Sequence, residues 1–292
     1  MGNTNVKGRH VLEVLAERFP QLYVAPSEEA EADHKNARTR GIAPKDATLT
    51  HFISSPEDEL REVDTPAGPV EVVFLENRAD FETFLQVIGH KSQPVPISRT
   101  VGAITYRGLA DWGKVRAAHQ AYLASGGDDW ASEFARLAKQ PESFRAELVV
   151  ISEGPYSNVP ATETPYDEEK WVRVSREIRL HHECAHVVCR RTMPDSILPV
   201  WDEVTADVVG LLCGTKGYDA ALAARFFGVA ATGYTGGRLS EYLDEAQSAR
   251  IDEVAIAVYS ACKRIEETYG EAEVADPFGY LLRLKEEPLL SF

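Results

Sequence analysis

The sequence lacks an apolar run long enough to cross a membrane. A bilayer-spanning helix needs about 18 or more consecutive apolar residues, and no segment of the 292-residue chain approaches that length. The N-terminal segment also lacks the apolar core and the small-residue cleavage site of a secretory signal. Val6 stands where N-myristoylation requires serine or threonine. These absences predict a protein with no membrane partner.

Cysteine is scarce and unevenly placed. The four cysteines are Cys184, Cys189, Cys213 and Cys262, and the preceding 183 residues contain none. A disulfide-stabilised secreted scaffold needs a denser and more regular set. The cysteine pattern therefore excludes a disulfide framework, and together with the missing secretory signal it predicts a cytoplasmic location.

Positive charge is also in short supply. The chain has 31 lysine and arginine residues against 46 acidic residues, which gives a net charge of -15. Such a surface repels polyphosphate, so we expect no nucleic-acid partner. The hydrophobic fraction of 44% and the charged fraction of 26% are those of an ordinary globular protein with ample material for a core. The composition leaves the oligomeric state open.

Residues 1–154 show a mixture of helical and strand patterns. The apolar spacing predicts helices at Arg9–Arg18, Ala79–Ile88, Trp112–Leu123 and Trp130–Leu137, and strands at Pro69–Leu75, Thr100–Tyr106 and Ala146–Ser152. The polar stretch from Ala25 to Lys45 has few apolar residues and is typical of a mobile loop or a solvated helix.

Residues 155–292 are predicted to be almost entirely helical. The expected helices are Asp167–Arg191, Val200–Cys213, Ala220–Gly228, Leu239–Thr268 with a possible break, and Phe278–Leu284. The two parts together indicate the α+β class, with a small mixed sheet followed by a helical half. Because no long linker separates them, we expect one compact unit with a shared cleft. Its sheet should pack on the Asp167–Arg191 helix, with Gly102 and Ala103 allowing close approach of an extended substrate.

The most informative motif is His182-Glu183-Cys184-Ala185-His186. On a helix, positions i and i+4 share a face and lie one turn apart, so His182 and His186 can converge on one zinc ion. Glu183 is offset from that face and can reach the remaining coordination position as a general base. The pattern H-E-x-x-H therefore predicts a zinc site with a catalytic carboxylate.

A third ligand is available on the following predicted helix. Glu203 lies 17 residues after His186, and Pro194 and Pro199 between them favour a sharp turn and a new helix start. Glu203 and Asp207 are again i and i+4. This spacing lets Glu203 bind the metal while Asp207 accepts the second ring N–H of a ligating histidine.

With H-E-x-x-H on one helix and E-x-x-x-D on the next, the segment Asp167–Gly214 resembles the gluzincins, the thermolysin-like branch of the zincin metallopeptidases. The resemblance implies a zincin-like fold and a peptide or protein substrate. It also implies zinc ligation by His182, His186 and Glu203, with Glu183 as the general base and Asp207 behind a ligand. Thermolysin-like enzymes use a later histidine as transition-state donor, but no histidine follows His186. The candidates for that role are Tyr218, Tyr234 and Arg238.

Other residues in and around these motifs have different expected roles. His181 is one residue off the ligand face and is expected to be peripheral, and Cys184 and Cys189 are expected to be small buried thiols. A di-iron site would need a second E-x-x-H on a core helix, but the other one, Glu31–His34, lies in the charged stretch without an apolar face. The segment Gly233–Gly237 has neither a P-loop lysine nor a dinucleotide pattern.

Two function classes remain open on the sequence. The first is a zinc-dependent metallohydrolase, a peptidase in which Glu183 activates the attacking water. The alternative is a non-catalytic zinc protein, in which the metal joins two helices and the first half binds a partner. The presence of Glu183 favours the first class.

Overall fold

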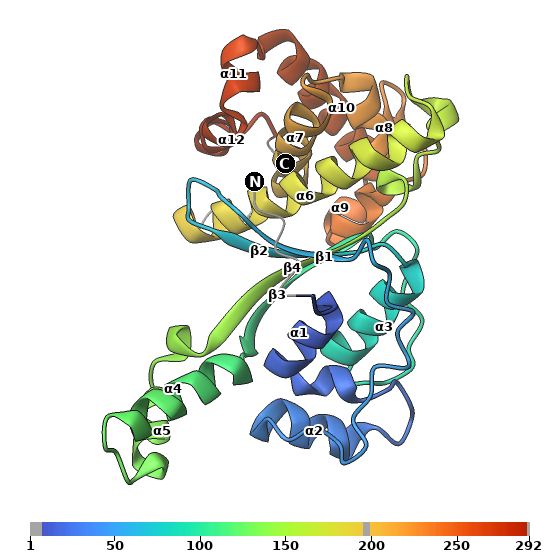
Figure 1. Cartoon of the computed structure of the whole chain (residues 1–292). Coiled ribbons are helices and arrows are strands. Elements are labelled where there is room, and N and C mark those ends of the chain that lie inside the picture. The colour runs from blue at the N-terminus through green and yellow to red at the C-terminus, as the bar shows by residue number, and fades with distance from the viewer. Residues whose placement is uncertain (1–7, 195–198, 291–292) are drawn as a thin grey trace. The chain divides into compact units, whose positions relative to one another are not determined.

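The computed structural model describes residues 8–194 and 199–290, which form a mixed α+β fold with a small sheet and many helices (Figure 1). The chain divides into two compact units. The first comprises the residues up to 62 together with 71–98 and 104–152, and the second comprises 63–70, 99–103 and the residues from 153 onward. Within the described ranges, no helix is both long and apolar enough to cross a bilayer.

The first unit is built on a four-stranded sheet with the order β1-β2-β4-β3. β2 and β4 pair in parallel, with Val72 opposite Val149 and Phe74 opposite Ile151. The strands are β1 (Glu59–Val63), β2 (Val70–Leu75), β3 (Ala103–Ala110) and β4 (Arg145–Ser152). The two central strands are almost wholly buried and rich in valine, as expected for strands covered on both faces.

Helices and short 3-10 turns precede or connect these strands. They are α1 (Val11–Arg18), η1 (Pro20–Tyr23), α2 (Glu31–Arg40), α3 (Arg78–Gly89), α4 (Trp112–Ala124), α5 (Trp130–Leu137) and η2 (Pro141–Ser143). Asp111 and Asp129 begin α4 and α5 by accepting hydrogen bonds from backbone N–H groups of the first turn. Figure 1 shows α4 and α5 following the end of β3.

The predicted elements of this unit are present within four residues of their expected bounds, and the three expected strands share one sheet. β1 was not predicted. The polar stretch Ala25–Lys45 contains a real helix, α2, whose His34 and Ala37 are buried. The expected packing of the sheet on the Asp167–Arg191 helix stays a prediction.

The second unit is helical apart from a two-stranded ribbon. Its elements are η3 (Tyr156–Asn158), η4 (Ala161–Glu163), α6 (Glu168–Thr192), α7 (Pro199–Thr215), α8 (Ala220–Phe227), β5 (Val229–Ala230), β6 (Gly233–Tyr234), η5 (Arg238–Tyr242), α9 (Glu245–Ser248), α10 (Ile251–Thr268), α11 (Glu271–Ala275) and α12 (Pro277–Glu286). The five predicted helices are all represented, and the Leu239–Thr268 prediction, which allowed for a break, corresponds to η5, α9 and α10.

The long helix α6 and its neighbour α7 carry the candidate site and pack directly against one another. Gly210 and Gly214 of α7 face Ile178 of α6. A Cβ atom added at Gly210 would lie 2.8 Å from the Ile178 carbonyl oxygen, and one at Gly214 would lie 2.8 Å from its side chain. Because only glycine leaves room for that backbone, these two positions set the close approach of the helices.

Contacts from α12 fix the start of α7. The Trp201 indole N–H donates to the Leu284 carbonyl at 2.9 Å, and the buried Lys285 ammonium pairs with Asp202. These contacts orient the turn of α7 that carries Glu203. The sharp turn expected between Pro194 and Pro199 falls largely on residues 195–198, which lie outside the described residues.

Candidate metal centre

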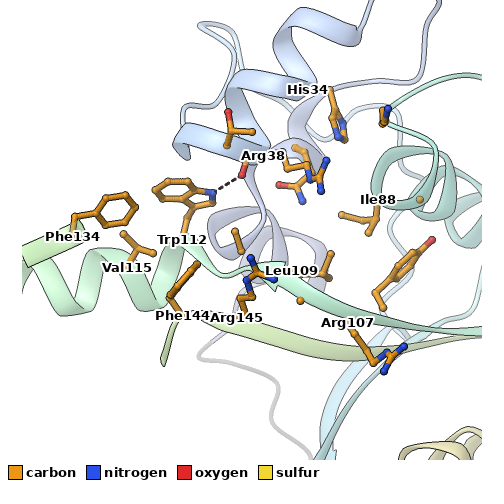
Figure 2. Close-up of a pocket in the computed structure, with 17 residues that line it drawn as sticks. His34, Arg38, Ile88, Arg107, Leu109, Trp112, Val115, Phe134, Phe144 and Arg145 are labelled. Carbon is orange, nitrogen blue, oxygen red and sulfur yellow. Dashed lines mark hydrogen bonds between the residues drawn. The ribbon is translucent and has the colours of Figure 1, made fainter. Parts of the chain in front are cut away.

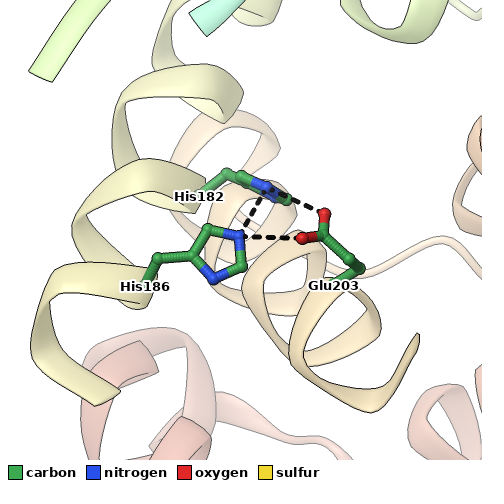
Figure 3. A group of neighbouring side chains, drawn as sticks. All are labelled: His182, His186 and Glu203. Atoms are coloured by element: carbon green, nitrogen blue, oxygen red, sulfur yellow. Dashed lines mark hydrogen bonds and ion pairs between the residues drawn. The ribbon is translucent and has the colours of Figure 1, made fainter. Parts of the chain in front are cut away.

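His182, His186 and Glu203 come together where α6 faces α7 (Figure 3). The Nε2 atoms of the two histidines are 3.0 Å apart. The Glu203 carboxylate closes the triangle, with one oxygen 3.4 Å from His182 Nε2 and the other 3.3 Å from His186 Nε2. The spacings i, i+4 on α6 and 17 residues to α7 thus bring the three expected ligands to one point.

This triangle has the dimensions of a zinc site. Nitrogen and oxygen ligands bind zinc at about 2.0–2.1 Å with tetrahedral angles, so neighbouring ligand atoms lie about 3.3–3.4 Å apart. The observed separations of 3.0, 3.3 and 3.4 Å match that edge length. Among the described residues this is the group of three or more histidine, cysteine or acidic side chains close enough to hold a metal ion.

Asp207 holds the His182 ring in place. Its Oδ1 atom lies 2.8 Å from His182 Nδ1, as expected for a carboxylate four residues after Glu203. Because a carboxylate accepts hydrogen bonds, Nδ1 carries the ring proton and Nε2 presents a lone pair to the metal position. His182 and Asp207 are both buried, so this contact is shielded from water.

A tyrosine and an arginine complete the surroundings of Asp207. The Tyr156 hydroxyl donates to Asp207 Oδ1 at 2.6 Å, and Arg238 pairs with Oδ2 of the same carboxylate. Arg238 also donates to the Tyr156 hydroxyl at 3.0 Å. Its guanidinium lies over two rings, 5.1 Å from the centroid of Tyr156 and 4.7 Å from that of Phe227. Asp207 is therefore both hydrogen-bonded and charge-compensated.

The charge of Glu203 favours a cation between the two histidines. Burial raises the pKa of Glu203, but hydrogen bonds from both histidines outweigh it and hold that pKa well below the usual value. Burial also disfavours ionisation of Asp207, yet Arg238 and His182 lower its pKa. Both carboxylates are thus ionised, and Arg238 compensates the charge of Asp207. The Glu203 charge then needs a metal ion or a proton on a neighbouring histidine.

In the metal-free cluster a proton takes that position. Burial lowers the pKa of His182, but the hydrogen bonds to Asp207 and Glu203 raise it to about 9. A metal ion would have to displace this proton, since a zinc ligand uses the neutral imidazole.

The remaining sequence-predicted residues occupy varied positions. Glu183 adjoins His182 on α6 and is half-buried. His181 is half-buried, with Nδ1 2.9 Å from the Glu177 carbonyl one turn earlier. Cys184 is buried and Cys189 partly buried, and neither forms a disulfide bond.

Of the three candidate transition-state donors, the structure brings Arg238 to the cluster, but behind Asp207. Tyr218 lies in the hydrophobic core of the second unit. The Tyr234 hydroxyl donates to the Gly237 carbonyl of its own loop at 2.5 Å. Tyr242 was not anticipated: burial raises its pKa, and the negative charges of Glu203 and Asp207 contribute in the same direction. Its neutral hydroxyl therefore lies beside a predicted metal ligand.

Tyr156 was also missed, because it lies 26 residues before His182 in an irregular turn. Its backbone N–H donates to the Ser175 hydroxyl at 2.9 Å. Arg179 of α6 donates to the carbonyls of Gly154 and Pro155 at 2.9 and 2.7 Å. These contacts to α6 carry the ring to the cluster. The only available signal was the aromatic residue after a Gly-Pro turn, which is too common to identify a site.

Comparison with known proteins gives one match. The model of a family described as "Family of unknown function (DUF7005)" matches residues 3–276, most of the chain. No curated protein and no solved structure matches.

Proposed function

We propose that this chain, which belongs to the DUF7005 family of unknown function, is a zinc-dependent hydrolase, most simply a peptidase, with a zincin-like arrangement around the metal. The observation that carries the proposal is the triangle of His182 Nε2, His186 Nε2 and the Glu203 carboxylate, with edges of 3.0–3.4 Å, next to Glu183 in an H-E-x-x-H helix.

The number of ligands favours a catalytic site over a purely structural one. Structural zinc sites are closed by four protein ligands, whereas catalytic sites have three and leave one position open. The group found among the described residues has three members. The alternative is a structural zinc that only joins α6 to α7. The group found among the described residues provides no fourth ligand for such a site.

Each residue has a defined task in this proposal. His182, His186 and Glu203 hold the ion, and Asp207 keeps the proton of His182 on Nδ1. Zinc, when bound, supplies Lewis acidity toward water and a substrate carbonyl. Glu183 takes the proton from the attacking water and transfers it to the leaving amine.

The test is a comparison of wild type and Glu183→Gln on a peptide library, with zinc measured in both proteins. The variant should keep about one zinc per chain and its thermal stability. Its rate of peptide hydrolysis should fall by about a hundredfold or more, because a positioned general base accelerates such a reaction by about 10²–10⁴. Asp207→Asn should be milder, about 10–100-fold, as is usual for a residue behind a ligand.

Glu169→Gln is the matched control. Glu169 is an exposed glutamate on the same helix, where it pairs with Arg173. It should cleave like wild type. Equal cleavage by wild type and Glu183→Gln would refute the hydrolase mechanism while leaving the metal site intact.

A further inference from the structure

The first unit contains a cavity of about 630 Å³, separate from the metal cluster. Its walls come from α2, the end of α3, β3, α4 and the start of β4 (Figure 2). This volume is within the usual range for small-molecule sites, about 300–1,000 Å³. All its lining residues belong to the first unit.

The cavity is strongly cationic in a chain of net charge -15. Arg38, Lys91, Arg107 and Arg145 line it, and no aspartate or glutamate does. None of the four forms an ion pair with a carboxylate of the described residues. These cations are exposed at the rim, and in Figure 2 the Arg107 side chain points away from the hollow. Cations at such a rim attract an anion, and arginine in particular suits the oxygens of phosphate.

One end of the cavity is aromatic. Figure 2 shows Trp112 and Phe134 together at the end away from His34. Their rings are stacked, with centroids 6.4 Å apart and planes inclined by 23°. The Trp112 indole N–H donates to the Arg38 carbonyl at 3.1 Å, which fixes the ring between α4 and α2. Gly41 lies against the Trp112 ring, and the rest of the aromatic pair lines this end of the cavity with surface that suits a planar ligand.

His34 supplies a third feature. It is 3% exposed, and its Nε2 atom is buried with no hydrogen-bond partner. The Ser92 hydroxyl donates to the Val24 carbonyl at 3.2 Å, so its oxygen must accept from His34 Nδ1, 3.1 Å away. The proton is therefore on Nδ1, and Nε2 is an unused acceptor. Burial, aided by the charges of Arg38 and Lys91, lowers the pKa of His34 and keeps the ring neutral.

The backbone at the cavity rim is strained at two consecutive residues that contribute to the cavity. Lys91 and Ser92 both have positive φ angles, 56° and 59°, which side-chain-bearing residues rarely adopt. This conformation places Lys91 on the cavity wall while Ser92, fully buried, holds His34. Consecutive strained residues of this kind are concentrated at binding sites.

We propose that this cavity binds a nucleotide: a phosphate-bearing anion with a flat ring that carries an N–H donor. In this proposal the phosphate binds beside the arginines, and the ring packs against Trp112 and Phe134. The N–H donor of the ring hydrogen-bonds to His34 Nε2. The overall negative charge still disfavours nucleic acid, whereas a single nucleotide needs only the local cations. This site does not depend on the proposed hydrolase function.

Isothermal titration calorimetry on the full chain tests the proposal. The probes are the diphosphates of adenosine, guanosine, cytidine and uridine, with adenosine and inorganic phosphate as fragments. At least one diphosphate should bind at least tenfold more tightly than either fragment, and its affinity should fall as salt is added. Arg38→Gln with Arg145→Gln should weaken that binding by about tenfold or more, and Phe134→Leu should weaken it while preserving the phosphate-only affinity.

The control is Arg9→Gln with Arg136→Gln, which removes the same charge from exposed arginines of the same unit that do not line the cavity. It should bind like wild type. Thermal unfolding of every variant verifies folding. Three results would each overturn the proposal: no binding of any diphosphate at 1 mM, inorganic phosphate as tight as the best diphosphate, or equal weakening in the control and the cavity variant.

Discussion

Asp207 does two things that a single surface carboxylate could not. It fixes the tautomer of His182 through Oδ1 and pairs with Arg238 through Oδ2. His182 and Asp207 are buried and the Arg238 side chain is only 12% exposed, so water screens both contacts weakly. Removing one partner of a buried pair leaves the other charge unsatisfied, which is more damaging than the loss of an exposed pair.

We therefore predict that Arg238→Gln lowers the free energy of unfolding by about 3–5 kcal/mol and weakens zinc binding by about tenfold or more. Chemical denaturation and competition with a zinc chelator measure the two effects. Arg225→Gln is the control, because that arginine pairs with Glu163 at an exposed site and should change stability by about 1 kcal/mol or less. Wild-type stability in Arg238→Gln would contradict the assigned role of the ion pair.

The ligand assignment is tested more directly at His186. His186→Ala removes one corner of the triangle and should abolish stoichiometric zinc, since three protein ligands are the minimum for a tight site. Emission spectroscopy on the dialysed protein measures the metal. His181→Ala, five residues earlier and outside the triangle, should retain about one zinc per chain. Full zinc in the His186→Ala protein would show that the metal is bound elsewhere.

At the scale of elements, the site depends on how closely α6 and α7 approach. Gly210 and Gly214 allow that approach, and α12 fixes the turn carrying Glu203 through Trp201 and Lys285. The ligand triangle tolerates only small shifts, because the metal–ligand distances are fixed to within about 0.2 Å. Helix spacing and metal affinity should therefore change together.

Gly210→Ala tests this coupling. The new methyl group would press on the Ile178 carbonyl, so the helices must move apart, and we expect a loss of about 1–3 kcal/mol in unfolding free energy together with weaker zinc binding. In Gly217→Ala the nearest atom is 3.8 Å from the new Cβ, an ordinary contact. That control should bind zinc like wild type. Tighter zinc binding in Gly210→Ala than in the control would exclude the packing argument.

The sequence predicts elements and ligands well where the pattern is local. Apolar periodicity located α6, α7 and the strands, and the i, i+4 spacing identified His182, His186, Glu203 and Asp207, whose side chains do converge. Patterns fail where position depends on tertiary contacts. Tyr156 reaches the cluster from an irregular turn, α2 has almost no amphipathic signal, and β1 is a short, half-exposed strand.

At the scale of the whole molecule, a net charge of -15 conceals local concentrations of opposite sign. The cavity of the first unit gathers four cations without a carboxylate, from positions between 38 and 145 that no sequence window would combine. The cluster of the second unit contains two carboxylates, the partly buried Glu203 and the buried Asp207, and Arg238 compensates the charge of Asp207. The net charge therefore predicts that the surface repels polyanions such as nucleic acid. It does not predict which small ions an individual cavity attracts.

The uncompensated charge of Glu203 gives the metal-free protein a distinctive pH dependence. In that state the pKa of His182 is about 9, against about 6.5 in the unfolded chain. Between these values the folded protein binds a proton that the unfolded chain does not, so the free energy of unfolding falls as pH rises. The full contribution, on the order of 3 kcal/mol, is present below pH 6.5 and is lost through pH 9.

Denaturation of the chelator-treated protein between pH 6.5 and 7.5 measures this slope, in a window below the range where unfolded cysteine thiols ionise. We expect stability to decrease across the window in the metal-free wild type. His182→Gln removes the titrating group, and saturating zinc replaces its proton in the wild type. In either case the free energy of unfolding should depend less on pH. If metal-free stability were constant or rising over this range, the buried charge would have to be compensated by a group other than His182, and the cluster would not be poised for a cation.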